Sequence, residues 1–214
     1  MKIGILGGTF DPVHFGHLRV AEEVGEAQGL EKVYLIPAAQ PPHKDKKPVS
    51  DFHHRLAMIR IATKGSPLLE AMDLEGRRQG LSYSIETLRE LQHYFGPQPE
   101  LFFIIGTDAF LEIKTWKEYS RLFDYSHFVV IERPGFHSDE LESFIYTLGA
   151  AFKKQGQQGH YVASSGKELF SKRATLLDIS ATRIREMVAA GRSIRYLVPY
   201  AVGVYIREKG LYKP

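Results

Sequence analysis

The chain of 214 residues contains no cysteine and only one tryptophan. Without cysteine it can form no disulfide, bind no metal through a thiolate and use no thiol as a nucleophile. This absence fits a reducing compartment, and we expect a cytoplasmic protein. No stretch approaches the ~20 consecutive apolar residues of a membrane-spanning helix. Glycines follow Leu6 at once, so no secretory leader is expected either. We therefore expect no membrane partner.

Acidic residues are scarce in the C-terminal part. The formal net charge is +3, but residues 1–150 carry 16 basic and 21 acidic side chains, whereas residues 151–214 carry 12 and 4. Such asymmetry indicates an anionic partner near the C-terminal part or a solvated basic surface. No run of five or six like charges is present, and none of the familiar nucleic-acid reader motifs occurs. We therefore expect no nucleic acid partner.

What the sequence does contain is an alternation of short apolar runs with helical patterns. The apolar runs predict strands at 2–6, 32–37, 68–72, 101–105, 127–131 and 175–177. Helical spacing predicts helices at 18–28, 52–63, 85–94, 109–113, 116–123, 138–148, 182–190 and 200–209. Asp51 and Ser84 are the expected N-caps of two of them, and 153–160 is expected to be a mobile loop.

Strands that alternate with helices predict an α/β fold. We expect a doubly wound, Rossmann-like and mostly parallel sheet with helices on both faces. The length suits one domain over residues 1–214, with a small C-terminal helical part from about residue 180. Ligands of such sheets bind at the carboxyl ends of the strands. The loops of interest are those after Leu6, Pro37, Ile105, Ile131 and Leu177.

The loop after the first strand has the most chemistry. It reads Gly7-Gly8-Thr9-Phe10-Asp11-Pro12-Val13-His14-Phe15-Gly16-His17. Its glycines let the backbone approach a ligand, but it is neither a dinucleotide-binding glycine motif nor a Walker loop. His14 and His17 are expected on one helix face near the positive end of the dipole, which suits a phosphate. Surface or capping histidines are one alternative. A metal site with Asp11 is another, which the spacing disfavours, so no metal ligand is predicted.

The whole loop resembles the N-terminal motif of the nucleotidyltransferase superfamily with the His-x-Gly-His element, here His14-Phe15-Gly16-His17. Other segments are similar to those of bacterial nicotinate-nucleotide adenylyltransferases. They are Pro41-Pro42-His43-Lys44, Ser82-Tyr83-Ser84-Ile85-Glu86-Thr87-Leu88, Phe103-Ile104-Ile105-Gly106-Thr107-Asp108, Thr115-Trp116, Arg133-Pro134-Gly135 and Ile179-Ser180-Ala181-Thr182-Arg183-Ile184-Arg185. Each alone is weak, but together they occur in order over residues 1–185.

This resemblance implies an enzyme of NAD biosynthesis that transfers AMP from ATP to nicotinate mononucleotide and releases pyrophosphate. It implies catalytic roles for His14, His17, Lys44 and Arg185. The ATP-binding residues that it implies are Gly7, Gly8, Thr9, Phe10, His14, His17, Gly106, Asp108, Arg133, Ser180, Thr182 and Arg185. For nicotinate mononucleotide it implies Thr9, Lys44, Tyr83, Ser84, Trp116 and Lys117. Mg²⁺ is the expected cofactor, bound mainly through the ATP phosphates.

Three positions depart from the commonest residues of the family. Ser84 stands where threonine is usual, Lys117 where tyrosine is usual and Ala181 where serine is usual. Backbone amides at the first two positions are the implied ligands of the nicotinate carboxylate, so the side-chain changes there are compatible with the function. Taken without the resemblance, Asp108 and Ser180 could be plain helix caps and Trp116 a core aromatic. Arg133 could equally be a turn residue.

Other functions stay open at this point. An adenylyltransferase of the same fold could act on nicotinamide mononucleotide or phosphopantetheine, although Trp116 and the 82–88 segment favour a pyridine nucleotide. A non-catalytic nucleotide sensor and a nucleic-acid-binding module that uses the basic part are rivals from other classes. Assembly into a homo-oligomer is not decided by the sequence.

Overall fold

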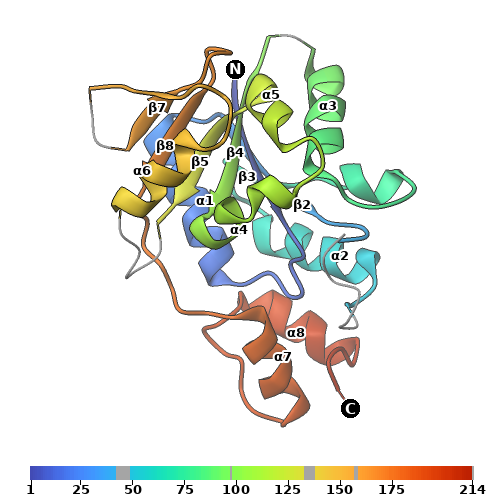
Figure 1. The fold of residues 1–214 in the computed structure, drawn as a ribbon. Helices are drawn as coiled ribbons and strands as arrows, with labels where there is room; N and C mark the ends of the chain where they lie inside the picture. The colour runs from blue at the N-terminus through green and yellow to red at the C-terminus, as the bar shows by residue number, and fades with distance from the viewer. Residues whose placement is uncertain (42–48, 97, 133–137, 157–158, 214) are drawn as a thin grey trace.

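The computed structural model describes residues 1–214 except 42–48, 97, 133–137, 157–158 and 214. Within the described part, an eight-stranded sheet has the order β3-β2-β1-β4-β5-β8-β7-β6 (Figure 1). The parallel strands are β1 (Lys2–Gly8), β2 (Lys32–Pro37), β3 (Leu69–Ala71), β4 (Glu100–Gly106), β5 (His127–Ile131) and β8 (Glu168–Lys172). An antiparallel edge is added by β7 (His160–Val162) and β6 (Lys153–Lys154).

Successive side chains along the central strands point to opposite faces and build two cores. One core contains Phe103 and Ile105 of β4 and is covered by α3 (Ser84–Phe95), α4 (Thr107–Leu111), α5 (Leu122–Tyr125) and α6 (Ser138–Tyr146). The other contains Phe102 and Ile104 and is covered by α1 (Phe15–Gln28), α2 (Phe52–Thr63), α7 (Ala181–Ala189) and α8 (Tyr200–Glu208). Helices cover both faces, which confirms the doubly wound, Rossmann-like prediction.

The predicted C-terminal helical part is formed by α7 and α8. Val202 and Ile206 of α8 are fully buried in the second core, and α8 packs on α2. Figure 1 shows α7 and α8 at the end of the molecule opposite the N-terminus, below the carboxyl end of β1. None of the described helices is long and apolar enough to cross a membrane. That residues 1–214 form one domain stays a prediction.

The strand predicted at 175–177 is wrong. The position beside β5 is taken by β8, with Phe128 opposite Leu169, and the chain then leaves the sheet. The N–H of Thr175 instead donates to Glu23 Oε2 of α1 over 2.6 Å. The loop predicted at 153–160 is also wrong at its two ends, because Lys153–Lys154 pairs with β7, which starts at His160. Short edge strands have too few residues to show a period.

Helix boundaries differ from the prediction where the local pattern is short. α3 begins at Ser84 with Tyr83 as its N-cap, one residue before the predicted cap. The two helices predicted over 109–123 are four shorter pieces, namely α4, the 3-10 turns η2 (Ile113–Thr115) and η3 (Tyr119–Arg121), and α5. A third 3-10 turn, η1 (Leu74–Arg77), follows β3. Asp51 is the N-cap of α2 as predicted, and Gly29 ends α1 in the left-handed conformation.

Candidate active site

The strand order places the candidate site at the carboxyl ends of β1 and β4. These strands are neighbours, with Leu6 paired to Ile104. The helices that follow them, α1 and α4, pack on opposite faces of the sheet. Doubly wound sheets bind ligands at the point where successive connections diverge in this way. Gly7 and Gly8 end β1, so the segment from Thr9 to His14, here called the β1 loop, starts at this point.

On the neighbouring strand, the predicted residues Gly106 and Asp108 lie at the same edge. Gly106 ends β4, and a side chain placed there would meet nothing within 4 Å among the described residues. Thr107 Oγ1 donates to the Ile131 carbonyl over 2.8 Å and ties the end of β4 to the end of β5. Asp108 is exposed in the first turn of α4. The backbone therefore offers open space beside an exposed carboxylate.

The two histidines of the motif are brought into contact. His14 is the N-cap of α1 in an extended conformation, and His17 lies within the first turn. Their rings stack with centroids 3.7 Å apart and planes at 24°. The sequence placed both on one helix face, whereas the structure joins them through the cap, where the His14 N–H donates to His17 Nδ1 over 3.3 Å. The edge of Phe10 packs on His17 with ring centroids 4.9 Å apart.

Burial keeps both imidazoles neutral. It lowers the pKa of His14 to about 4. Burial, with the neighbouring His14, also holds the pKa of His17 well below its ordinary value. Because His17 Nδ1 accepts a hydrogen bond, its proton resides on Nε2, which is then a donor. His14 Nδ1 is buried without a partner among the described residues. The pair can therefore supply neutral N–H donors rather than fixed positive charges.

Backbone geometry around the histidines is tight. A Cβ at Gly16 would lie 3.1 Å from the His14 ring and 3.4 Å from the Leu177 carbonyl oxygen. Phe10 adopts φ 52°, a left-handed conformation that is uncommon for a bulky residue, and is held there with 2% of its surface exposed. Strained backbone that the surrounding packing enforces is found at functional sites more often than elsewhere.

The predicted C-terminal motif folds onto the β1 loop. Ser180 is the N-cap of α7, and Thr182, two residues further on, lies in the first turn. Arg185 Nη1 donates to the backbone carbonyl of Asp11 over 2.6 Å, and its Nη2 donates to Thr182 Oγ1 over 3.2 Å. The N-terminus of a nine-residue helix, a threonine hydroxyl and a guanidinium thus meet the start of α1. N–H groups and cations in this arrangement attract an anion.

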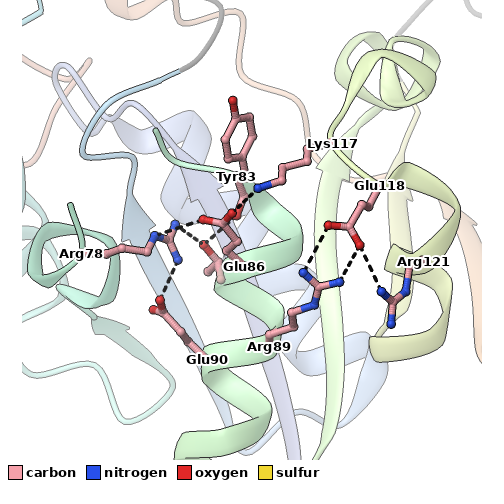
Figure 2. Close-up of polar contacts among 9 residues, drawn as sticks. Arg78, Tyr83, Glu86, Arg89, Glu90, Lys117, Glu118 and Arg121 are labelled. Atoms are coloured by element: carbon pink, nitrogen blue, oxygen red, sulfur yellow. Dashed lines mark hydrogen bonds and ion pairs between the residues drawn. The ribbon is translucent and has the colours of Figure 1, made fainter. Parts of the chain in front are cut away.

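A second group of predicted residues lies at the start of α3. Ser82 exchanges two hydrogen bonds with Gln40, which follows β2, so Tyr83 and Ser84 are held at the carboxyl end of the sheet. Lys117 Nζ lies 4.7 Å from the centre of the Tyr83 ring and forms an ion pair of 2.5 Å with Glu86. Figure 2 shows that the carboxylate of Glu86 also forms an ion pair with Arg78.

Trp116 packs against the first core and lies two residues before an ion-paired glutamate. Its ring packs edge-on against Phe103 of β4 with centroids 6.2 Å apart. Glu118, the residue after Lys117, forms an ion pair with Arg89 of α3 over 2.6 Å (Figure 2). The ring is only partly buried, although it packs against the first core. Trp116 therefore packs against the core with part of its ring and leaves the rest of the ring accessible.

Two polar residues beside the site, Arg55 and Tyr212, were not identified from the sequence. Arg55 of α2 has 2% of its surface exposed, and Tyr212 is joined to Asp11 from the far C-terminal part. Neither belongs to a recognisable motif. Asp11 was considered only as a metal ligand, and no group of three metal-binding side chains is found among the described residues. Lys44 and Arg133 lie outside the described residues.

Comparison with known proteins supplies the family. A family profile described as cytidylyltransferase-like matches residues 5–187. The chain is 46% identical over 213 residues to a protein of Geotalea daltonii, which covers 99% of this chain and 98% of that one. It is 47% identical over 219 residues to a protein of Desulfatibacillum aliphaticivorans, with 99% and 100% covered. Both are named "Probable nicotinate-nucleotide adenylyltransferase". The chain belongs to the nicotinate-nucleotide adenylyltransferase family.

Membership of this family confirms the resemblance and makes the chain a nucleotidyltransferase. The fold agrees with it. Nicotinic acid mononucleotide adenylyltransferase of Plasmodium falciparum, solved in complex with NaAD, superposes with a TM-score of 0.75 at 21% identity. The alignment covers 99% of this chain and 97% of that one. The same enzyme in complex with APC gives a TM-score of 0.73. At this identity the likeness shows the fold alone.

Proposed function

We propose that this chain transfers AMP from ATP to nicotinate mononucleotide and forms deamido-NAD and pyrophosphate. One observation supports the proposal most. The stacked His14–His17 pair lies at the start of α1, beside the β1–β4 switch point, and Arg185 of α7 bonds the β1 loop that leads to it. Curated relatives with 46–47% identity over nearly the whole chain carry the name of this reaction. An anion site at a nucleotide-binding switch point is what a triphosphate requires.

The reaction is a direct displacement. A phosphate oxygen of nicotinate mononucleotide attacks the α-phosphorus of ATP and forms the new P–O bond. The bond from that phosphorus to the β-phosphate oxygen breaks, and pyrophosphate leaves with the electron pair. The attacking phosphate is already anionic at pH 7, so no general base is needed. Catalysis then consists of positioning the two nucleotides in line and stabilising the charge that develops.

The triphosphate is proposed to bind between α1 and α7. His17 donates from Nε2 and His14 lies stacked on it, while Ser180, Thr182 and Arg185 approach from the other side. Neutral donors suit oxygens whose negative charge grows as pyrophosphate leaves. Gly7, Gly8, Thr9 and Phe10 are proposed to contact ATP from the end of β1. Gly106 and Asp108 are proposed to contact its nucleoside from the end of β4. The roles of Lys44 and Arg133 stay predictions.

Nicotinate mononucleotide is proposed to bind beside α3, with a further contact to Thr9. The first N–H groups of that helix, which starts at Ser84, have no intrahelical acceptor and lie at the positive end of the dipole. They suit the nicotinate carboxylate, which the amide substrate lacks. Trp116 is proposed to stack on the pyridine ring, with Tyr83 and Lys117 beside it. The Lys117 ammonium is already paired with Glu86, so its backbone is the group proposed to bind.

Mg²⁺ is proposed to enter with ATP rather than to reside in the protein. Both carboxylate oxygens of Asp11 already accept hydrogen bonds, from the Ser50 N–H and the Tyr212 hydroxyl. The neighbouring histidines offer nitrogen, whereas Mg²⁺ prefers oxygen. The described residues therefore do not fit a resident magnesium site. When bound to the phosphates, the ion supplies charge neutralisation, and no protein residue is assigned to it.

One assay tests the proposal. Pyrophosphate release would be measured with ATP, Mg²⁺ and, in turn, nicotinate mononucleotide, nicotinamide mononucleotide and phosphopantetheine. We expect the highest kcat/KM for the nicotinate substrate. Equal values for the two pyridine nucleotides would overturn the preference for the acid. Release of no pyrophosphate with any of the three would favour the nucleotide sensor.

A cytoplasmic location and a homo-oligomeric assembly are separate proposals. The lack of cysteine supports the first, and cell fractionation tests it. The second is tested by sedimentation velocity over a range of protein concentrations, where a constant sedimentation coefficient equal to that of a 24.3 kDa monomer would exclude it.

A further inference from the structure

Asp11 is the point where three distant parts of the chain meet. Its side chain is buried, with 3% of its surface exposed. Oδ2 accepts the N–H of Ser50, just before α2, over 3.1 Å. Oδ1 accepts the hydroxyl of Tyr212 over 2.7 Å. The backbone oxygen accepts Arg185 Nη1 of α7 over 2.6 Å. The middle of the β1 loop is thus bonded to three other segments of the chain.

The Tyr212 hydroxyl is the hydrogen-bond donor in its contact with Asp11. Burial, and the adjacent carboxylate of Asp11, raise the pKa of the Tyr212 phenol, so its hydroxyl stays protonated. The Leu197 carbonyl also accepts the N–H of Phe15 over 3.1 Å, directly after the β1 loop. The C-terminal part therefore contacts the loop near its centre and at its end.

Arg55 of α2 also holds the loop, through backbone carbonyls. Its guanidinium donates to four backbone carbonyls, those of Ser50, Thr9, Ala38 and Ala39, over 2.8, 2.9, 2.7 and 3.4 Å. Thr9 belongs to the β1 loop, whereas Ala38 and Ala39 follow β2. A buried guanidinium that donates to four carbonyls fixes the backbone positions of those residues, because its five donors lie in one rigid plane.

We propose that Tyr212 and Arg55 are positioning residues for adenylyl transfer, which hold the β1 loop through Asp11 and Thr9 so that His14 and His17 meet the triphosphate. Neither residue touches the reacting atoms. This inference rests on the proposed function. Between β1 and α1 the loop belongs to neither a strand nor a helix, so contacts from other segments contribute to its conformation. Displacing a catalytic group by 1 Å can cost about 10²-fold in rate.

The test removes one hydroxyl. In Tyr212→Phe, we expect kcat to fall about tenfold or more and the Kd for ATP to rise several-fold. The KM for nicotinate mononucleotide is expected to change less than the Kd for ATP, because most of its proposed contacts lie beside α3 and only Thr9 belongs to the β1 loop. Circular dichroism and Tm verify that the variant is folded.

Tyr205→Phe is the matched control. Tyr205 also belongs to the C-terminal part, and its hydroxyl lies 2.9 Å from His54 Nδ1 of α2, a residue outside the β1 loop. Its removal costs one comparable hydrogen bond, so a similar loss in Tm is expected without a change in kcat. If both variants lose kcat equally, Tyr212 is only structural and the proposal is wrong.

A double-mutant cycle tests whether Tyr212 acts through Asp11. In an Asp11→Ala background, which lacks both acceptor oxygens, Tyr212→Phe is expected to change kcat by less than about twofold, because the two residues act as one unit. An undiminished effect in that background would overturn the role of Asp11. Arg55→Lys keeps the charge but not the four donors, and it is expected to lower kcat in the same way. Calorimetric ATP affinity needs no acceptor nucleotide, so it tests the positioning even if nicotinate mononucleotide proves not to be the substrate.

Discussion

At the residue scale, the candidate site depends on histidines that are kept uncharged. A lysine or arginine would attract every polyphosphate, including the product pyrophosphate. Neutral N–H donors from stacked rings bind the ground-state phosphates less strongly than a cation would. Their hydrogen bonds strengthen as negative charge develops on the phosphate oxygens in the transition state. Arg55, a buried cation of this region, donates to backbone carbonyls rather than to a ligand. Arg185 also bonds the backbone of the loop, at the Asp11 carbonyl.

His17→Ala tests the donor role. We expect kcat to fall about 10²–10³-fold, the cost of losing one donor to a transition-state oxygen, with the protein still folded. Pyrophosphate release under saturating substrates measures it. The exposed His93 at the end of α3 is the control, and His93→Ala should leave kcat unchanged. Near-normal turnover of the His17 variant would remove this residue from the mechanism.

The lowered pKa values of the two histidines predict a pH dependence of stability. Unfolded histidine titrates near pH 6.5, whereas burial lowers the pKa of His14 to about 4 in the folded chain. Between these values the unfolded state binds more protons, so the free energy of unfolding falls as the pH falls from 6.5 to 4. His14→Gln should make this decline shallower, by up to about 1.4 kcal/mol per pH unit. Urea unfolding from pH 4 to 8 measures it, with His93→Gln as the control. An unchanged slope would contradict the burial of a neutral His14.

At the scale of elements, the start of α1 is where helix, loop and C-terminal motif come closest. Gly16 allows this approach, since its hydrogen faces both the His14 ring and the Leu177 carbonyl. The central strands β1 and β4 could be predicted from the sequence because burial on both faces of the sheet makes each of them a nearly continuous apolar run. The cap geometry at His14 could not, because it depends on contacts from residues far away in the chain.

Gly16→Ala is expected to separate activity from stability. The added Cβ lies 3.1 Å from the His14 ring, so the ring must move by a few tenths of an ångström and kcat should fall several-fold. Gly203→Ala in α8 is the matched control. Its Cβ meets only Val198, at 3.6 Å, and alanine should stabilise that helix by about 0.5–1 kcal/mol. Thermal unfolding and steady-state kinetics of both variants measure this. Full activity of Gly16→Ala would show that His14 needs no fixed position.

At the scale of the whole molecule, the sequence predicted the doubly wound sheet, and the edge that carries the candidate site follows from that fold. The glycine turns, the histidine pair and the Ser180–Arg185 motif were all identifiable, because each is a local pattern. The network of Asp11, Arg55 and Tyr212 was not, because buried polar pairing depends on which segments the fold brings together. The strands β6 to β8 were missed or misplaced for a related reason, since their pairing partners decide their positions more than their own composition does.

Ligand binding at the carboxyl edge should stabilise the whole chain. ATP at 100 times its Kd adds about 2.7 kcal/mol to the free energy of unfolding, which corresponds to a rise in Tm of about 5–11 °C for a chain of this size. Duplex DNA at the same concentration should not change Tm. Differential scanning calorimetry at low and high salt measures both. A salt-sensitive rise with DNA would favour the nucleic-acid-binding alternative.

The bond from Tyr212 to Asp11 also sets an order of events during synthesis. The two residues are 201 positions apart in the chain. At about 5–20 residues per second, the ribosome adds Tyr212 roughly 10–40 s after Asp11. Until then the β1 loop lacks one of its holding contacts, while β1, β2 and β4 can already pair. A nascent chain can therefore build most of its sheet well before it can close the loop that holds the histidines.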